Sequence, residues 1–342
     1  MAYTNIDDPS AYFQTKTYTG NSGVQFVTND GNSDLQPDWV WIKNRTVGYS
    51  HQLYDSTRGT TKAIFSDLTQ AETTISNGLL TFNTDGFGVN SAAAVNENEL
   101  VAWQWKANGG TTSTDTTSSI TSTVQVNSDA GFSIVTYTGN GNTLGGFGHG
   151  LGVAPKVVFV KRRNAAANWC VYHESIGAGF YLQLNTTAAQ QSGPWQNLAP
   201  NSTTVIVYGG GLVNGNGDTY VAYCFAEKQG YSKFGKYVGN GNTNGPFVYT
   251  GFKPAVIIHK SITTTKNWGI ITGGTFENEI DARLNPNLSA AEGTGTMVDF
   301  LSNGFKWRTT NGTANTNGAT YIYMAFAENP FTTSTGIPTT AR

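Results

Sequence analysis

The chain carries the stretch YVAYCFAE at Tyr220–Glu227 and repeats its pattern as YIYMAFAE at Tyr321–Glu328. A third, more distant version, LVAWQWK, occupies Leu100–Lys106. In an extended strand successive side chains point to opposite faces, so Trp103 and Trp105 would share one face with a valine. Large apolar side chains on one face favour a core, although an aromatic platform for sugar stacking is the alternative. The three stretches predict three buried strands in equivalent positions.

Two further landmarks precede each of these stretches. The first is a Tyr-Thr-Gly-Asn or Tyr-Val-Gly-Asn motif, typical of a turn after a strand because Gly and Asn tolerate positive φ. The second is an apolar run near a proline. The motifs lie at Tyr18–Asn21, Tyr137–Gly141 and Tyr237–Gly241, and the runs at Gln36–Lys43, Ala154–Lys161 and Lys253–Lys260. From motif glycine to final lysine the separations are 23, 22 and 21 residues, which indicates three diverged copies of one module.

The apolar runs, such as VVFV at Val157–Val160, are too short for helices and rich in β-branched residues. They predict strands covered on both faces, or strands at a contact between modules. Charged residues make up only 12% of the chain, and Gly, Thr and Asn, which disfavour helix, replace them. We therefore expect an all-β fold of three tandem diverged repeats, each a small, mostly antiparallel β-sandwich. Helix is expected only as one turn at Asp67–Glu72.

The expected organisation follows from these landmarks and from a Thr/Ser/Gly-rich segment after the first copy. It comprises an N-terminal arm (1–15), module 1 (16–107), a linker (108–131), module 2 (132–229), module 3 (230–331) and a C-terminal tail (332–342). The linker is expected to contain one exposed strand at Ile120–Val124. Because the join between modules 2 and 3 is short, these two are expected to pack rigidly, with module 1 on a looser tether.

Charge and hydropathy restrict the partners. Twenty Lys and Arg against twenty-two Asp and Glu give a net charge of −2, so no basic field exists for a phosphate backbone and nucleic acid is not expected. No stretch is long enough for a transmembrane helix, and the first residues do not resemble a signal peptide, so membrane insertion is not expected. Cys170 and Cys224 lie in apolar runs and are expected to be buried free thiols.

Four stretches of the chain resemble a family found in marine and environmental bacteriophage genomes. They are DDPSAYF (Asp7–Phe13), PDWVWIKNR (Pro37–Arg45), HQLYDSTRG (His51–Gly59) and FAENPF (Phe326–Phe331), which together span nearly the whole chain. The resemblance implies a virion structural protein, of the kind labelled tail fibre, with a fold similar to concanavalin-A-like β-sandwiches. It brings no catalytic residues, and a fold alone assigns no function.

The densest polar cluster of module 1 lies within residues 51–58. Buried charges usually occur paired, so a network that fixes a loop is one interpretation, and a ligand-binding or intersubunit contact is the other. Trp169 and Trp268 each follow an Asn. The candidate ligand-binding residues are His51, Tyr54, Asp55, Arg58, Trp169 and Trp268. No cofactor is expected, and the oxygen-rich turns at 30–34 and 214–218 lack EF-hand spacing, so no metal site is predicted.

Signs of catalysis are weak. A sandwich glycosidase needs carboxylates at alternate positions of a strand, and Glu277, Glu279 and Asp281 have that spacing. Arg283, however, stands where the acid/base carboxylate would be expected, and the other modules have no such cluster. We therefore expect a protein without enzymatic activity.

Two functions from different classes fit the sequence. In the first, a tail-fibre or attachment component contacts host surface polysaccharide through aromatic and Asn-rich loops, since sugar sites combine aromatic faces with amides. In the second, a capsid-decoration, head-fibre or filament-forming protein binds no ligand, since the modules repeat without a module-specific polar site. Both imply a virion assembled in the host cytoplasm, other virion proteins as partners, and a homo-oligomer, for which we expect a trimer.

Overall fold

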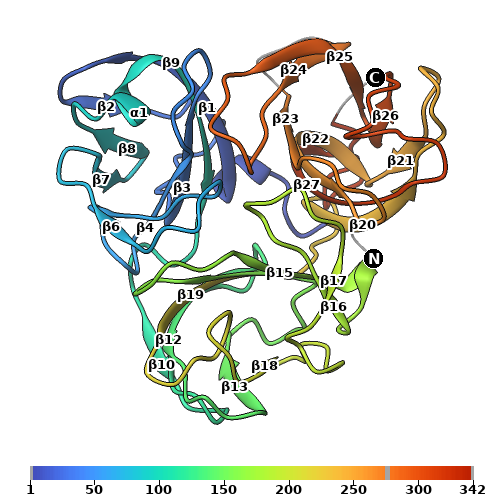
Figure 1. Cartoon of the computed structure of the whole chain (residues 1–342). Coiled ribbons are helices and arrows are strands. Elements are labelled where there is room, and N and C mark those ends of the chain that lie inside the picture. The colour runs from blue at the N-terminus through green and yellow to red at the C-terminus, as the bar shows by residue number, and fades with distance from the viewer. Residues whose placement is uncertain (1–2, 274–277, 340–342) are drawn as a thin grey trace.

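The computed structural model describes residues 3–273 and 278–339, and it is built almost entirely of antiparallel strands. Three lobes lie around a common centre (Figure 1). Each lobe contains an inner sheet, one face of which packs at the centre, and an outer sheet. The predicted all-β fold is confirmed.

The three inner sheets share one strand order. The first is β1 (Phe13–Asn21), β9 (Glu97–Trp105), β3 (Trp39–Asn44) and β4 (Gln52–Asp55). The second is β12 (Phe132–Thr138), β19 (Thr219–Phe225), β14 (Val157–Arg162) and β15 (Cys170–His173), with β11 (Ser122–Asn127) and β10 (Ser113–Asp115) added beside β12. The third is β20 (Ser232–Val238), β27 (Thr320–Pro330), β22 (Phe252–Ser261) and β23 (Gly269–Thr272). Three copies of one module would produce this arrangement.

The outer sheets vary more in size. They are β2 (Gln25–Val27), β8 (Gly86–Val89) and β7 (Leu79–Asn83) in the first lobe; β13 (Gly145–Gly148) and β18 (Thr204–Val207) in the second; and β21 (Phe247–Tyr249), β26 (Gly304–Trp307), β25 (Gly293–Leu301) and β24 (Ile280–Arg283) in the third. Two short pairs join β5 (Lys62–Ala63) to β6 (Thr73–Thr74) and β16 (Phe180–Tyr181) to β17 (Gln191–Ser192). Within the described residues, helix is limited to α1 (Ala93–Asn96) and the 3-10 turns η1 (Pro9–Ala11) and η2 (Glu174–Ile176).

The strands β9, β19 and β27, which contain the three repeated stretches, are buried on both faces because each face packs in a different core. In β9, Val101, Trp103 and Trp105 belong to the central core, whereas Leu100 and Ala102 pack inside the first lobe against the outer sheet. The other two lobes divide their inner strands in the same way. Both sequence interpretations of the apolar runs are thus confirmed: the strands are covered on both faces, and one face lies where the lobes meet.

Aromatic rings carry the contacts at the centre. Trp39 of the first lobe stacks on Tyr223 of the second with ring centroids 4.2 Å apart. Phe13 stacks on Phe326 of the third lobe at 5.3 Å, and Phe326 meets Phe225 at 5.7 Å. The predicted looser tether of module 1 is therefore wrong, because its largest side chains are buried against both other lobes.

The predicted linker also belongs to the folded body. β10 and β11 lie within residues 108–131 and extend the second inner sheet, because β11 pairs antiparallel with β12 and β10 with β11. Ile120 and Val124 are only 3% and 2% exposed, so the strand expected there is not exposed. Alternation of small polar and apolar residues in this segment buries one face, which its Thr- and Ser-rich composition conceals.

The helical turn predicted at Asp67–Glu72 is absent. The carbonyl of Thr69 accepts a hydrogen bond from the Ala167 amide, and the Glu72 amide donates to the Arg163 carbonyl, both at 2.8 Å. These backbone groups serve the second lobe and cannot close a helical turn as well. The segment crosses between lobes in an extended form.

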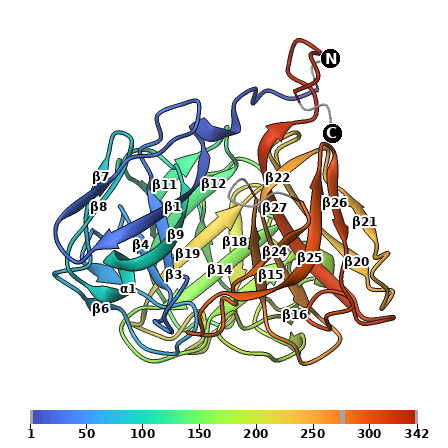
Figure 2. The ribbon, with the colours of Figure 1, turned by 90° about the horizontal axis from the view of Figure 1, so that it is seen from above.

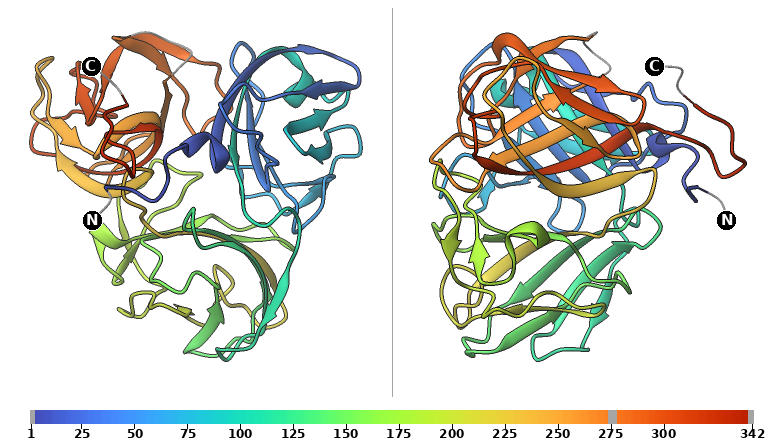
Figure 3. Two further views of the ribbon diagram at one scale, coloured as in Figure 1. Left: turned by 180° about the vertical axis from the view of Figure 1, so that it is seen from behind. Right: turned by 90° about the vertical axis from the view of Figure 1, so that its right-hand side faces the viewer.

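Both terminal segments lie at one end of the molecule, which we call the terminal end (Figure 2). Residues 3–12 cross from the third lobe to the start of β1 (Figure 3). The Tyr3 hydroxyl donates to the Gly251 carbonyl at 2.6 Å, and the Thr4 hydroxyl donates to the Gln229 carbonyl at 2.8 Å. The predicted N-terminal arm is thus bound to the body along its described length, and it is shorter than expected because β1 begins at Phe13.

Candidate functional site

The two candidate tryptophans and His51 occupy equivalent positions, each immediately before the last strand of its inner sheet. From each position a ring nitrogen reaches a backbone carbonyl of the next lobe. The pairs are Trp169 Nε1 to Phe65 O at 2.7 Å, Trp268 Nε1 to Gln183 O at 2.9 Å, and His51 Nε2 to Asn285 O at 3.1 Å. The three contacts run in one rotational sense and close a ring around the centre.

A second set of contacts joins the same three boundaries, with donor and acceptor lobes exchanged. Each is a backbone amide that donates across a lobe boundary. The pairs are Glu72 to Arg163 at 2.8 Å, Gln190 to Ile262 at 3.1 Å and Glu292 to Arg45 at 2.7 Å. Two boundaries add an ion pair between the same residues, whereas Gln and a buried Ile replace it at the third. The boundaries are therefore built on one plan with diverged side chains.

The remaining candidates form a buried network between the first and second lobes. The Tyr223 hydroxyl donates to Asp55 Oδ2 at 2.6 Å, and Arg58 Nη2 donates to that hydroxyl at 3.2 Å. Arg58 Nε also binds the Asp55 carboxylate, and Nη1 donates to Glu72 Oε2 at 3.0 Å. Tyr54 donates to Gln52 in the same strand.

All six candidates are buried, with Arg58 the most exposed at 9%. This corrects the prediction that they form a ligand-binding surface: their polar groups bind protein groups and present no face to solvent. For the cluster at residues 51–58, the other interpretation, a polar network that fixes a loop, fits these contacts. His51 is in addition held neutral, because burial and the nearby Lys43 lower its pKa to about 3.

Sequence reasoning missed three buried lysines that end the apolar runs. Lys43, Lys161 and Lys260 are each 0% exposed and donate to backbone carbonyls. Burial lowers their pKa values to about 8, 7 and 7, respectively. A cation at the same end of three apolar runs was the signal that could have identified them. Lys161 joins two lobes, because it donates to the Thr69 carbonyl of the first lobe at 2.8 Å, whereas Lys43 and Lys260 donate within their own lobes.

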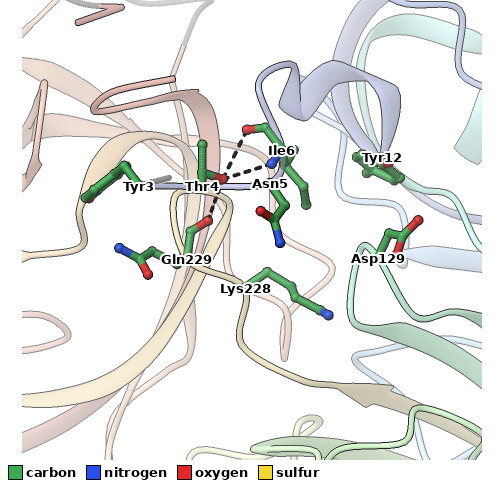
Figure 4. A pocket seen from close by; sticks show the side chains of 8 residues that line it. All are labelled: Tyr3, Thr4, Asn5, Ile6, Tyr12, Asp129, Lys228 and Gln229. Atoms are coloured by element: carbon green, nitrogen blue, oxygen red, sulfur yellow. Dashed lines mark hydrogen bonds between the residues drawn. The ribbon is translucent and has the colours of Figure 1, made fainter. Parts of the chain in front are cut away.

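A pocket at the terminal end departs from the repeat. Its volume is about 450 Å³, and Figure 4 shows the segments that enclose it: the N-terminal arm, the turn before β12 and the join before β20. The lining residues are Tyr3, Thr4, Asn5, Ile6, Tyr12, Asp129, Lys228 and Gln229. The arm that forms one wall precedes β1, and no described segment takes the same place before β12 or β20.

Four polar side chains of this pocket are uncommitted. Asn5, Asp129 and Gln229 are exposed and Lys228 is half-buried. Among residues 3–273 and 278–339, none of these four side chains has a hydrogen-bond or ion-pair partner. Tyr12 borders the same space, and burial together with the Asp129 carboxylate raises its pKa. The pocket thus offers one cation, one anion, two amides and a phenol to whatever occupies it.

The carboxylates at residues 277–281, which have the spacing of a sandwich glycosidase, do not form a pair of free carboxylates in the described residues. Glu277 lies outside them. Glu279 pairs with Arg308 at 3.3 Å, and Arg283 donates to the Thr313 hydroxyl at 3.1 Å. Asp281 is exposed on β24.

The described part of the chain contains no group of three or more His, Cys, Asp or Glu that could hold a metal ion. Of the candidate calcium turns, Asp30 pairs with Lys16 at 2.8 Å, and Asp218 pairs with Arg162. No helix in the described residues is long and apolar enough to span a membrane.

Comparison with curated proteins and with solved structures finds no match. A family model described as a domain of unknown function, DUF7483, matches residues 8–330. The matched region contains all three inner sheets and the ring of contacts that joins them. The chain therefore belongs to the DUF7483 family.

Proposed function

We propose that this chain is a non-enzymatic structural protein of a bacteriophage particle, an attachment component that contacts host surface polysaccharide. The observation that carries the proposal is the closed ring of lobe contacts, with both terminal segments bound at one end. A body locked in this way transmits force without internal hinges, which an attachment part requires. The resemblance of four long stretches to bacteriophage virion proteins supports the setting.

The terminal end supplies a specific place for the contact. Uncommitted amides beside a tyrosine, in a pocket that the repeat does not explain, are the kind of groups that recognise sugars. The candidate residues predicted from sequence do not serve this purpose, because they are buried between the lobes. The proposal therefore moves the ligand contact from the lobe boundaries to the terminal end.

Other virion proteins and further copies of the chain are the proposed partners. The inner sheets already pack against one another within the chain, so a homo-oligomer, with a trimer expected for a fibre, would have to form through outer surfaces. Sedimentation of the purified chain measures this directly.

A second candidate, a decoration or filament-forming protein without ligand binding, is favoured by exposed aromatics on edge strands. Phe26 of β2 is 65% exposed, and Phe247 and Tyr249 of β21 are 46% and 55% exposed. β2 and β21 lie at the edges of their sheets, where a neighbouring molecule could pack.

Antibody labelling of intact particles, viewed by electron microscopy, distinguishes the two candidates. Label at the distal end of the tail is expected for an attachment component. Label over the capsid would replace it by the decoration candidate. Particles from a producing host that carry no label, while the chain is present in the lysate, would contradict both.

A further inference from the structure

We propose that the pocket at the terminal end binds a neutral saccharide unit. The inference rests on the proposed function only for the biological source of the sugar. Its chemistry comes from the residues that line the pocket.

The first argument is that the pocket interrupts a repeated architecture. At the lobe boundaries, the three lobes place ring nitrogens and backbone amides in equivalent positions, and these groups are bonded within the protein. Here Asn5, Asp129, Lys228 and Gln229 come together without protein partners among the described residues. Places where a sequence departs from the rules of its own fold are where function is expected.

The second argument is the mixture of donors and acceptors. Asp129 only accepts, Lys228 only donates, and the amides of Asn5 and Gln229 do both. A sugar hydroxyl both donates and accepts, so a ring with several hydroxyls can use every one of these groups. A phosphate or sulfate is an anion whose oxygens are mainly acceptors, and the Asp129 carboxylate would repel it. The opposite charges of Asp129 and Lys228 leave the pocket without a net charge, which favours a neutral ligand.

The third argument is that the walls are held in place before a ligand arrives. The Thr4 hydroxyl donates to the Gln229 carbonyl at 2.8 Å and accepts from the Ile6 amide at 2.9 Å, which fixes the arm (Figure 4). Tyr12 packs edge-to-face on Tyr231 with centroids 6.0 Å apart. A prearranged wall lowers the entropic cost of binding a small ligand. The volume of about 450 Å³ falls in the range of small-ligand sites.

The test uses the purified full chain, with saturation-transfer NMR for the sugars and phosphorus-31 line broadening for phosphate, which has no carbon-bound proton. The probes are four neutral disaccharides with gluco, galacto, manno and N-acetylglucosamine configurations, and inorganic phosphate as the anionic comparison. We expect at least one disaccharide to bind with Kd on the order of 1 mM, and phosphate not to bind. Asp129→Ala and Asn5→Ala should each weaken that disaccharide about tenfold or more. Both side chains are exposed, so both variants should fold, which circular dichroism checks.

Asp281→Ala is the matched control, because it removes an exposed carboxylate from β24 in the outer sheet of the third lobe. It should leave the affinity unchanged. The proposal is overturned if no disaccharide of the panel binds below about 10 mM, if Asp129→Ala binds as tightly as the wild type, or if phosphate binds as well as the sugar. None of these results bears on whether particles contain the chain. A negative NMR result would contradict the sugar site alone, and a negative labelling result would contradict the virion function alone.

Discussion

At the scale of single residues, the Tyr-x-Gly-Asn motifs are explained by an asparagine that clamps each turn. Asn96, Asn214 and Asn315 are 0% exposed. The side-chain oxygen of each accepts from the backbone amide of the motif asparagine, at 3.0, 2.9 and 2.8 Å, respectively. The motif glycine admits the clamp, because a Cβ on Gly239 would lie 2.3 Å from the Thr316 carbonyl oxygen.

Removing a clamp should destabilise the fold. Asn315→Ala leaves the Asn240 amide and the buried carbonyls around it without partners, which costs about 1–3 kcal/mol of unfolding free energy. Urea unfolding monitored by tryptophan fluorescence measures the loss. Asn142→Ala, at an exposed turn position with no side-chain partner in the described residues, is the control and should change stability by less than about 0.5 kcal/mol. Equal effects of the two variants would contradict the clamp.

Buried histidines should make the protein sensitive to acid. His51 Nδ1 accepts from the Trp41 indole at 2.8 Å while Nε2 faces the Asn285 carbonyl, so the neutral ring is fully used and a second proton has no acceptor. Burial lowers the pKa of His51 to about 3 and that of His173 to about 4. The unfolded chain takes up these protons near pH 6.5 and the folded chain does not, so stability is lost as pH falls below 6.5.

Each of these histidines should remove about 2 kcal/mol of stability between pH 7 and pH 5. The measurement is the free energy of unfolding in urea across this range. His51→Gln, which keeps an amide donor for the Asn285 carbonyl, should flatten the slope by the share of one histidine. A loss of stability that is the same at every pH does not change the slope of unfolding free energy against pH, so the two effects can be distinguished. An unchanged slope would show that His51 titrates normally in the folded protein.

At the scale of elements, the sequence was informative where one strand determines its own environment. The apolar runs and the three repeated stretches predicted strands buried on both faces, and the Tyr-x-Gly-Asn motifs predicted the turns after β1, β12 and β20. The sequence-based prediction failed where the partner of a segment lies far away in the chain. The segment at Asp67–Glu72 binds backbone groups of Arg163 and Ala167, and the predicted linker pairs with β12. Neither partner is visible in a local pattern.

The same limit applies to the candidate site. The cluster at residues 51–58 was recognisable as a group, but its burial depends on Tyr223, from another lobe. The pocket at the terminal end draws on residues near positions 3–12, 129 and 228, which no sequence motif connects. Proximity created by the ring of lobes had to come from the structure.

The boundary between the first and second lobes should depend on Asp55. Its carboxylate neutralises Arg58, and both side chains are 0% exposed. Asp55→Ala leaves a buried guanidinium with only Glu72 opposite it, which should cost about 3–5 kcal/mol of unfolding free energy. Asp30→Ala is the control, because the Asp30 side chain is 71% exposed in its pair with Lys16, and it should cost less than about 1 kcal/mol. A small effect at Asp55 would mean that water reaches Arg58.

At the scale of the whole molecule, the central core joins three sandwiches that could otherwise have been independent domains. Side chains from all three inner sheets belong to one buried cluster, and the cyclic hydrogen bonds close around it. Removing one lobe would expose large aromatic faces of the other two. The lobes should therefore unfold as one cooperative unit rather than in three steps.

Two probes in different lobes can test this cooperativity. Four of the eight tryptophans, Trp39, Trp41, Trp103 and Trp105, lie in the first lobe and two in each of the others, so fluorescence weights the first lobe most. Cys170 and Cys224, both buried in the second lobe, report through labelling with a thiol reagent, and burial raises the pKa of Cys224 to about 12. In urea the two signals should share one midpoint, and the thiols should stay unlabelled below it. Asn96→Ala, a change whose side-chain hydrogen bonds all lie within the first lobe, should then shift both midpoints by the same amount. If thiol labelling keeps the wild-type midpoint while the fluorescence midpoint moves, the second lobe is stable without the first and the shared core does not couple them.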